Sequence, residues 1–286
     1  MKSYPENYCF EENEHFIRKK KTGRLTLINR SLFSDAIDLC IQSPDIYLDK
    51  STILKDEDGT KAGIAVLDDN SKVFIKKYTG KNISYSFKYM FRNARPVKVW
   101  RVSWLLENNN ILFPKSMAII TSRKCRLLGD CYLFTQVIDN AVQSDRFFES
   151  TLIDSDHVME FCSRVMDLLA NIHRLGIVHG DCKLSNFFVE NYSETNYRIG
   201  IWDLDGASIN NTVSSNIGMT DITRFIAAVI EKSNKLNLHL NIAKLLEHCI
   251  KCYENKFDFC LNPSLIELGV RKHLKRKNIN YEFDKM

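Results

Sequence analysis

The sequence predicts an α+β fold with two lobes, a small antiparallel sheet followed by a mainly helical part. Strand-like alternation between turn residues dominates the first half of the chain. Apolar residues at three- and four-residue intervals dominate the second half. The polar stretch after Ile138 is the expected boundary, so residues 1–138 form the N-terminal lobe and residues 139–286 the C-terminal lobe. A hydrophobic content of 44% suffices for a sizeable core.

The small lobe is expected to contain strands over residues 51–54, 63–67, 72–78, 115–120 and 132–137, with a helix over residues 96–107. Turn-forming Asp, Asn and Gly residues separate the first strands. An N-terminal extension over about residues 1–48 precedes them. Its segment 33–41 is expected to be an added helix that packs on the small lobe.

The large lobe is expected to begin with an amphipathic helix that ends at Gly176 and is capped by Asp154, Ser155 or Asp156. The apolar residues of this helix are Val158, Phe161, Cys162, Val165, Met166, Leu168, Leu169 and Ile172. After it come the loop HGDCKLSN, a short strand over residues 187–189, a polar turn, and a second strand over residues 198–202.

Asp181, Lys183 and Asn186 of that loop, with Asp203 at the end of the second strand, are the residue types that phosphoryl transfer needs. Asp181 would orient the acceptor hydroxyl and accept its proton, and Lys183 would neutralise charge on the transferred group. Asn186 and Asp203 would hold Mg²⁺. Taken alone, short HGD or DLD motifs are better explained by a buried core histidine and by acidic residues on the surface. Their order and spacing together predict a catalytic loop in a two-lobed protein-kinase-like fold.

Four residues around the loop have supporting roles or open alternatives. His179 is expected to brace the loop, and Gly180 to permit its tight backbone. Asp205 is an alternative metal ligand, or an acid that supports the metal site. Asp221 opens a helix, where stabilising the helix dipole accounts for it fully. Anchoring the catalytic loop is the other role that an acid at this position has in kinase-like folds.

A nucleotide site is expected in the small lobe. Lys76, in the strand Val73-Phe74-Ile75-Lys76, would bind the phosphates, with Lys77 pointing the other way. Gly59 and Gly63 lie where a glycine-rich loop would cover the phosphates, although an ordinary hairpin explains them almost as well.

Two further contacts would complete the nucleotide site. The backbone of Gln136 to Ile138 is expected to contact the adenine of ATP. Glu107 is the acidic residue available between Tyr78 and Asn110 as an ion-pair partner for Lys76, and it is equally explained as a solvated residue at a helix end.

The formal net charge is only +5, yet the positive residues cluster. Each cluster alone is best explained as a solvated face, but three of them favour an anionic acceptor or an anionic membrane surface as partner, and no nucleic acid is expected. The clusters are Arg18, Lys19, Lys20, Lys21 and Arg24; Lys81, Lys88, Arg92, Arg95, Lys98 and Arg101; and Arg271, Lys272, Lys275, Arg276 and Lys277.

The nine cysteines are odd in number and dispersed, which favours reduced core thiols over disulfides. His248, Cys249, Cys252 and Cys260 are potential metal ligands, but their stretch is better explained as an amphipathic helix. No uncharged apolar run is long enough to span a bilayer, and no apolar signal region opens the chain, so a cytoplasmic protein is expected. The oligomeric state stays open.

The chain resembles the lipopolysaccharide core kinase family in the segments VFIKKY, RNARPVKVWR, ILFPKSMAI, HGDCKLSNFFV and IWDLDGA. The resemblance implies ATP as donor, Mg²⁺ as cofactor, and a heptose or Kdo hydroxyl of the lipid-linked inner core as acceptor. It also implies work at the cytoplasmic face of the inner membrane. The chain departs from the family pattern at Val99, beside the place of a helix glutamate, and at Gly206, in place of an arginine.

Two other functions compete with this one. The first is an atypical kinase that acts on a protein or another small molecule. The absence of an APE-type ending after Asp203 argues against a regulated protein kinase and favours a small-molecule or glycolipid acceptor. The second is a pseudokinase scaffold, which the missing helix glutamate and the poor glycine loop would allow.

Overall fold

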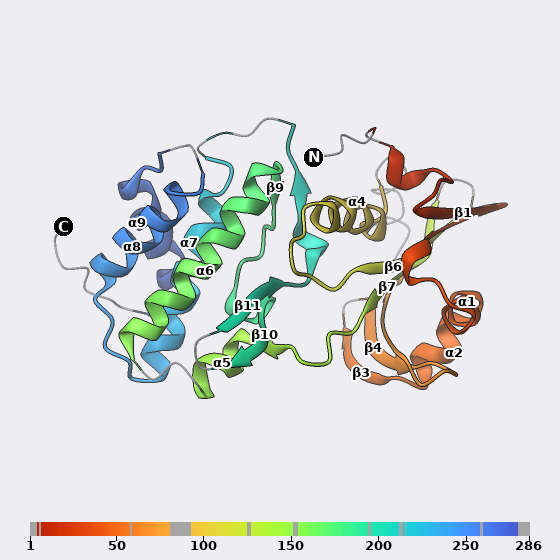
Figure 1. The fold of residues 1–286 in the computed structure, drawn as a ribbon, viewed down its shortest axis with the longest axis horizontal. Helices are drawn as coiled ribbons and strands as arrows, with labels where there is room; N and C mark the ends of the chain where they lie inside the picture. The colour runs from red at the N-terminus through yellow and green to blue at the C-terminus, as the bar shows by residue number, and fades with distance from the viewer. Residues whose placement is uncertain are drawn as a thin grey trace. The chain divides into compact units, whose positions relative to one another are not determined.

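The computed structural model describes residues 5, 7–57, 59–80, 93–124, 127–150, 154–193, 196–211, 214, 216–257 and 260–279. The chain divides into two compact units. The first comprises Met1–Glu107 and Pro114–Asp139, and the second comprises Asn108–Phe113 and Asn140–Met286. The chain passes into the second unit for the last time after Asp139, one residue beyond Ile138. Figure 1 shows both units and labels many of their helices and strands.

The first unit contains an antiparallel sheet of seven strands among the described residues, in the order β1-β2-β6-β7-β5-β4-β3. This sheet confirms the α+β class. The strands are β1 (Phe16–Lys21), β2 (Arg24–Asn29), β3 (Thr52–Glu57), β4 (Thr60–Val66), β5 (Lys72–Tyr78), β6 (Ser116–Lys124) and β7 (Leu127–Gln136).

Strands β1 and β2 were not expected from the sequence and come from the N-terminal extension. Strand β1 lies at the edge of the sheet, and after Phe16 and Ile17 its residues are exposed and charged. Such a strand buries one face only at its start, so the alternation that marks a strand in sequence is absent. The pairing of β2 with β6 joins the extension to the sheet.

Two helices of the extension, α1 (Asp35–Gln42) and α2 (Pro44–Asp49), pack on one face of the sheet. Helix α1 is the added helix expected over residues 33–41, and the Ser34 side chain caps it by accepting from the Ile37 N–H. The shared core contains Ile37, Cys40, Val73, Ile75 and Phe134, among others. Helix α4 (Arg95–Asn108), the helix expected over residues 96–107, lies across the sheet from α1 and α2 in Figure 1.

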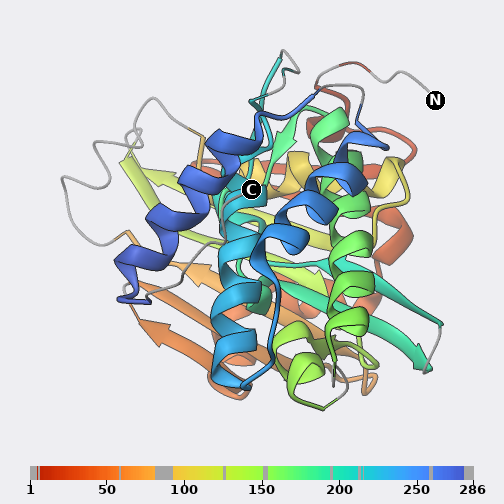
Figure 2. The same ribbon diagram turned by 90° about the vertical axis from the view of Figure 1, so that its left-hand side faces the viewer.

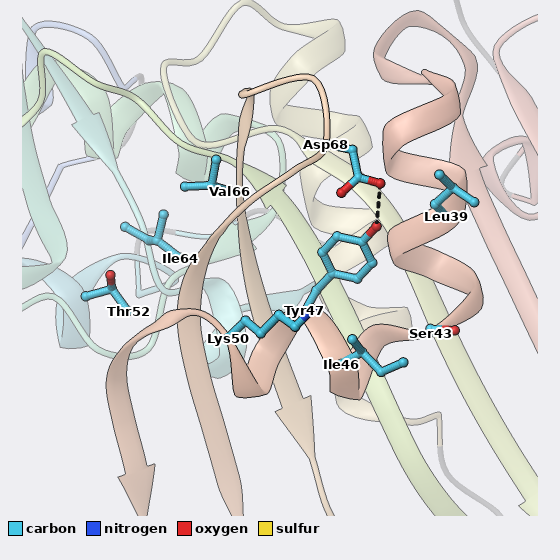
Figure 3. A pocket seen from close by; sticks show the side chains of 9 residues that line it. All are labelled: Leu39, Ser43, Ile46, Tyr47, Lys50, Thr52, Ile64, Val66 and Asp68. Carbon is cyan, nitrogen blue, oxygen red and sulfur yellow. Dashed lines mark hydrogen bonds between the residues drawn. The ribbon is translucent and has the colours of Figure 1, made fainter.

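A hollow of about 500 Å³ lies between α1, α2 and strands β3 and β4. Figure 3 shows Tyr47 across it, donating a hydrogen bond of 3.2 Å to Asp68. Ile46 and Val66 line the hollow and are more than half exposed. No residue that the sequence assigns to catalysis or nucleotide binding lines it.

The second unit is mainly helical and carries a small sheet in the order β11-β10-β8, beside the pair β9 and β12. Figure 2 shows α6, α7, α8 and α9 from the side. Its helices are α5 (Ser144–Ser150), α6 (Ser155–Arg174), α7 (Met219–Lys235), α8 (Ile242–Glu254) and α9 (Pro263–Arg276). Its strands are β8 (Val142–Gln143), β9 (Ile177–Val178), β10 (Phe187–Ser193), β11 (Asn196–Ile201) and β12 (Ser208–Ile209). Short 3-10 turns are η1 (Tyr8–Phe10) and η2 (Arg30–Leu32) in the first unit, and η3 (Leu184–Asn186) and η4 (Leu204–Gly206) in the second.

Helix α6 ends where the sequence predicts. Asp154 is its N-cap and accepts from the N–H groups of Asp156 and His157. Gly176 follows the last turn in the left-handed conformation, with φ of 73°, which glycine adopts without strain. The capped helix leads directly into β9 and the loop after it.

The described cysteines are free thiols. Burial raises the pKa of Cys9 and of Cys40 to about 12, so both stay protonated and inert. Cys252 contacts Ser163 and His248, whereas Cys260 is exposed. Among the helices of the described ranges, none combines the length and the apolar character that a bilayer crossing requires.

Candidate active site

The HGDCKLSN loop is anchored to helix α7 by Asp221. The Asp221 carboxylate accepts from the backbone N–H of His179 at 2.7 Å and from that of Gly180 at 2.8 Å. Asp221 is fully buried, and it also pairs with His173 at 3.2 Å. The Tyr253 hydroxyl lies 2.8 Å from the other ring nitrogen of His173. Of the two roles left open for Asp221, anchoring the loop is therefore the one that its carboxylate performs.

The environment of Asp221 keeps its carboxylate ionised. Burial by itself raises the pKa of this group, because a charge loses its hydration in the interior. Hydrogen bonds from His173 and from the His179 backbone outweigh burial, so the pKa of Asp221 lies below its ordinary value. The loop thus rests on a buried negative charge.

His179 braces the loop, as expected. Its Nδ1 accepts from the Asp181 N–H at 3.2 Å, and its Nε2 donates to the Trp202 carbonyl at 3.0 Å. The Trp202 indole donates to the Ser185 carbonyl at 2.7 Å and stacks on Phe188. These bonds connect the loop to the end of β11, just before Asp203.

Gly180 and Gly206 let two backbone segments pass close together. Gly180 has φ of 78°, and a Cβ on it would lie 2.8 Å from the Gly206 carbonyl oxygen. A Cβ on Gly206 would lie 3.1 Å from the His179 carbonyl oxygen. Close backbone packing thus favours glycine at position 206.

Three cationic or amide side chains surround the Asp181 carboxylate. Asn186 donates from Nδ2 to the Asp181 backbone carbonyl at 2.8 Å and to Asp181 Oδ2 at 3.1 Å. Lys183 Nζ lies 3.6 Å from the same Oδ2. On the other side, Arg224 Nη2 contacts Asp181 Oδ1. The structure thus brings Asp181, Lys183 and Asn186 together, as the sequence predicts.

The sequence reasoning missed Arg224. It lies on α7 three positions after Asp221, so both residues are on neighbouring positions of one helix face. That spacing from the anchoring aspartate was the available signal. It identifies Arg224 only once Asp221 is known to face the loop.

Asn186 and Asp203 lie at the same end of the β10–β11 hairpin. Phe187 pairs with Ile201, and the Trp202 N–H donates to the Asn186 carbonyl at 3.1 Å. Asp203 has φ of 58° and ψ of 61°, a left-handed conformation that is uncommon for a residue with a side chain. Such strain concentrates at functional sites. Asp205 follows on η4.

In the first unit, Lys76 is half-buried on β5, where it pairs with Ala62 of β4 and Leu133 of β7. Its Nζ lies 5.7 Å from the centre of the Tyr78 ring. Lys77 points to the opposite face, as expected, and forms ion pairs with Asp45 and Asp130 at 3.0 Å each. Although burial lowers the pKa of Lys77, the hydrogen bonds that its ammonium group donates to these two carboxylates raise the pKa above its ordinary value.

Both carboxylate oxygens of Glu107, the residue considered as an ion-pair partner of Lys76, contact other side chains. One of its carboxylate oxygens pairs with Lys115 at 2.9 Å, and the other accepts from Asn29 at 3.2 Å. Glu107 lies near the end of α4, and Asn29 is the last residue of β2. The Glu107 carboxylate therefore connects helix α4 to a strand of the N-terminal extension. The N-terminal extension, to which the sequence assigns no function, thus supplies Asn29 as a partner of Glu107.

The remaining nucleotide-site predictions fall in the β3–β4 turn and at the end of β7. Gly59 is in the turn, with φ of 67°, and its carbonyl accepts from the Thr79 N–H. Gly63 lies inside β4, not in the loop, and a Cβ on it would come within 2.2 Å of Ser51 Oγ. The Gln136 N–H donates to the Lys115 carbonyl, so that donor is already used inside the lobe. Ile138 follows β7 and is half-buried.

Two comparisons with known proteins bear on the fold and on the family of the chain. A solved structure titled "WaaP in complex with acyl carrier protein" matches with a TM-score of 0.60 and 14% identity, covering 82% of this chain and 92% of that chain. This likeness confirms the protein-kinase-like fold. No curated protein matches the chain. The model of the lipopolysaccharide kinase (Kdo/WaaP) family matches residues 52–225, more than half of the chain and the part that holds β5 and the HGDCKLSN loop. The chain therefore belongs to the lipopolysaccharide kinase family and is a phosphotransferase.

Proposed function

We propose that the protein transfers the γ-phosphate of ATP to a hydroxyl of heptose or Kdo in the inner core of lipopolysaccharide. The observation that carries this proposal is the Asp181 carboxylate, on a loop fixed by a buried aspartate and flanked by Lys183 and Asn186. Family membership supports the kinase reaction and the lipopolysaccharide substrate class.

Asp181 orients the acceptor hydroxyl and takes its proton as the oxygen attacks the γ-phosphorus. Positioning and charge stabilisation supply most of the catalysis of phosphoryl transfer. The Asn186 and Lys183 side chains hold Asp181 Oδ2 in place. Lys183 also offsets the negative charge of the transferred phosphoryl group, because its ammonium group is about half exposed and lies next to Asp181.

The residues at the end of the β10–β11 hairpin fit Mg²⁺. One amide oxygen and one carboxylate are hard oxygen donors of the kind that Mg²⁺ binds, with nucleotide phosphates and water as further ligands. Because Asn186 uses its Nδ2 group to donate to Asp181, its amide oxygen remains to act as a ligand. Asn186 and Asp203 would hold the ion, which neutralises charge on the phosphates of ATP.

The function is tested by incubating the protein with labelled ATP and dephosphorylated core oligosaccharide. Label should enter the oligosaccharide, and mass spectrometry of the product identifies heptose or Kdo as the acceptor. Parallel reactions with a protein mixture and with a panel of small alcohols test the atypical-kinase alternative. If no acceptor takes phosphate and the nucleotide gives no thermal shift, the pseudokinase alternative stands instead.

Replacing Lys76 by methionine is expected to lower kcat/KM for ATP by roughly 10²- to 10³-fold, the usual effect of removing one electrostatic contact to a reacting group. Lys72→Met on the same strand is the matched control, because Lys72 is exposed and pairs only with the exposed Asp139 among the described residues. Steady-state kinetics with varied ATP measure the effect. Equal losses in the two variants would remove Lys76 from nucleotide binding.

We also propose peripheral binding to an anionic membrane through strand β1, where Arg18, Lys19, Lys20 and Lys21 are exposed. Each such residue contributes about 1 kcal/mol near an anionic surface. Co-sedimentation with vesicles that contain anionic lipid should therefore weaken when Lys20 and Lys21 are replaced by glutamine. Binding that changes neither with these substitutions nor with added salt would refute membrane binding through β1.

A further inference from the structure

The contact between Arg224 and Asp181 has no part in the mechanism above. Arg224 comes from α7, its side chain is 40% exposed, and its Nη2 contacts Asp181 Oδ1. Oδ1 is buried, and among the described residues the ion pair with Arg224 is the contact that the structure shows for it.

The two oxygens of the Asp181 carboxylate face different groups. Oδ2 faces Asn186 and Lys183, the residues assigned to the metal and to the transferred phosphoryl group. Oδ1 faces Arg224. An acceptor hydroxyl that attacks in line approaches phosphorus from the side opposite the leaving group. Because Oδ2 is engaged by Asn186 and Lys183, Oδ1 is the oxygen that remains for an acceptor hydroxyl, and such an acceptor would lie beside Arg224.

Arg224 and several positive side chains of the C-terminal helix act on one common neighbour, His273. Helix α9 packs against α7 so closely that a Cβ on Gly269 would lie 2.5 Å from Thr223 Cγ2. The next turn of α9 carries His273, whose pKa is lowered first by burial and then by Arg224, Arg276, Lys272 and Lys277. Glu231 pairs with Lys277. Lys272 and Arg276 are exposed and act on the same imidazole as Arg224 does.

We propose that Arg224 recognises a negatively charged group, a carboxylate or a phosphate, that the acceptor sugar carries near the hydroxyl to be phosphorylated. This inference rests on the proposed function and names Arg224 as the residue that recognises the anionic group of the acceptor. Without acceptor, Arg224 contacts Asp181. When the acceptor binds, its anion takes over the guanidinium, which pairs well with planar carboxylates and with phosphates, and Asp181 Oδ1 accepts from the hydroxyl.

The test compares charged acceptors with neutral analogues. The acceptors are a Kdo glycoside and its methyl ester, and a heptose phosphate and the unphosphorylated heptose. For the wild-type protein, kcat/KM should favour the charged member of one pair, which identifies carboxylate or phosphate as the recognised group. Arg224→Gln should reduce that preference by roughly 10- to 100-fold, mainly through KM, because a hydrogen-bonded ion pair is lost. Arg224→Lys should restore it in part, since a lysine keeps the charge but not the planar fork.

Arg271→Gln is the matched control. Arg271 also lies on a helix of this unit, but it pairs with Glu267 four positions before it. Its replacement should leave the preference unchanged. A wild-type protein that uses charged and neutral acceptors equally, or an Arg224→Gln variant that keeps the full preference, overturns the inference while the proposed function stands.

Direct binding separates this inference from failure of the proposed function. Isothermal titration with free Kdo and with the heptose phosphate needs no phosphate transfer. The wild-type protein should bind one of them at least 10-fold more tightly than Arg224→Gln does, with thermal unfolding as the check that the variant folds. Binding that the substitution leaves unchanged, or the absence of binding to either sugar, refutes recognition by Arg224 whatever the transfer assay gives.

Discussion

Asp181→Asn is expected to lower kcat for phosphate transfer by roughly 10²- to 10⁴-fold, the usual contribution of a positioned general base. An amide cannot take the hydroxyl proton, although its oxygen can still accept the hydrogen bond from Asn186. The fold should survive, because Asp221, and not Asp181, holds the loop backbone. Thermal unfolding and single-turnover transfer from labelled ATP measure the two effects separately.

Asp167→Asn is the control for this prediction. Asp167 lies on α6 and is about half exposed, with a loose ion pair of 3.8 Å to Lys256. Its replacement should leave both kcat and the unfolding temperature near their wild-type values. Transfer at an undiminished rate by Asp181→Asn would exclude Asp181 as the base and would require a different residue to orient the acceptor.

Asp221→Ala is expected to lower the free energy of unfolding by about 3–5 kcal/mol and to abolish activity. The change leaves the N–H groups of His179 and Gly180 without their acceptor and His173 without its carboxylate. Asp221→Asn keeps the shape and one acceptor oxygen, so it should recover part of the stability. Urea unfolding measures all variants, with Asp167→Ala as the exposed control.

The effect of Asp221 should depend on pH. Its folded-state pKa lies below the ordinary value of 3.8, so its contribution is fully present above that value. The contribution is lost as pH falls through the folded-state pKa. The stability gap between wild type and Asp221→Ala should therefore be constant near neutral pH and should narrow only in strong acid. A loss of less than 1 kcal/mol at neutral pH would show that the loop has another anchor.

Local patterns made much of this fold predictable. The alternation in residues 72–78 reflects a strand with one face against the core, and it separated the directions of Lys76 and Lys77 correctly. The three- and four-residue period of α6 and its Asp154 cap depend on neighbours within one turn of helix. The contacts of Asp181 with Lys183 and Asn186 are formed inside one short loop. Such short-range relations are visible in a single sequence.

Partners distant in sequence were not predictable. Glu107 is the acidic residue that the sequence offers as an ion-pair partner of Lys76, but the packing of α4 and β2 places its carboxylate against Lys115 and Asn29. Strand β4 begins at Thr60, three residues before the predicted start, so Gly63 lies inside the strand, where it packs closely against Ser51, rather than in a loop. The residues of edge strand β1 are mostly exposed, so its sequence does not alternate between apolar and polar residues.

The sequence by itself determined the α+β class, the order of the elements and the catalytic loop with its aspartate, lysine and asparagine, because each depends on residues close along the chain. Only the tertiary structure decided that Asp221 anchors the loop and that Arg224 contacts Asp181. Both follow from the way α7 packs beneath the loop, which brings together residues about forty positions apart. Packing across such separations depends on the whole core and leaves no periodic trace in the sequence.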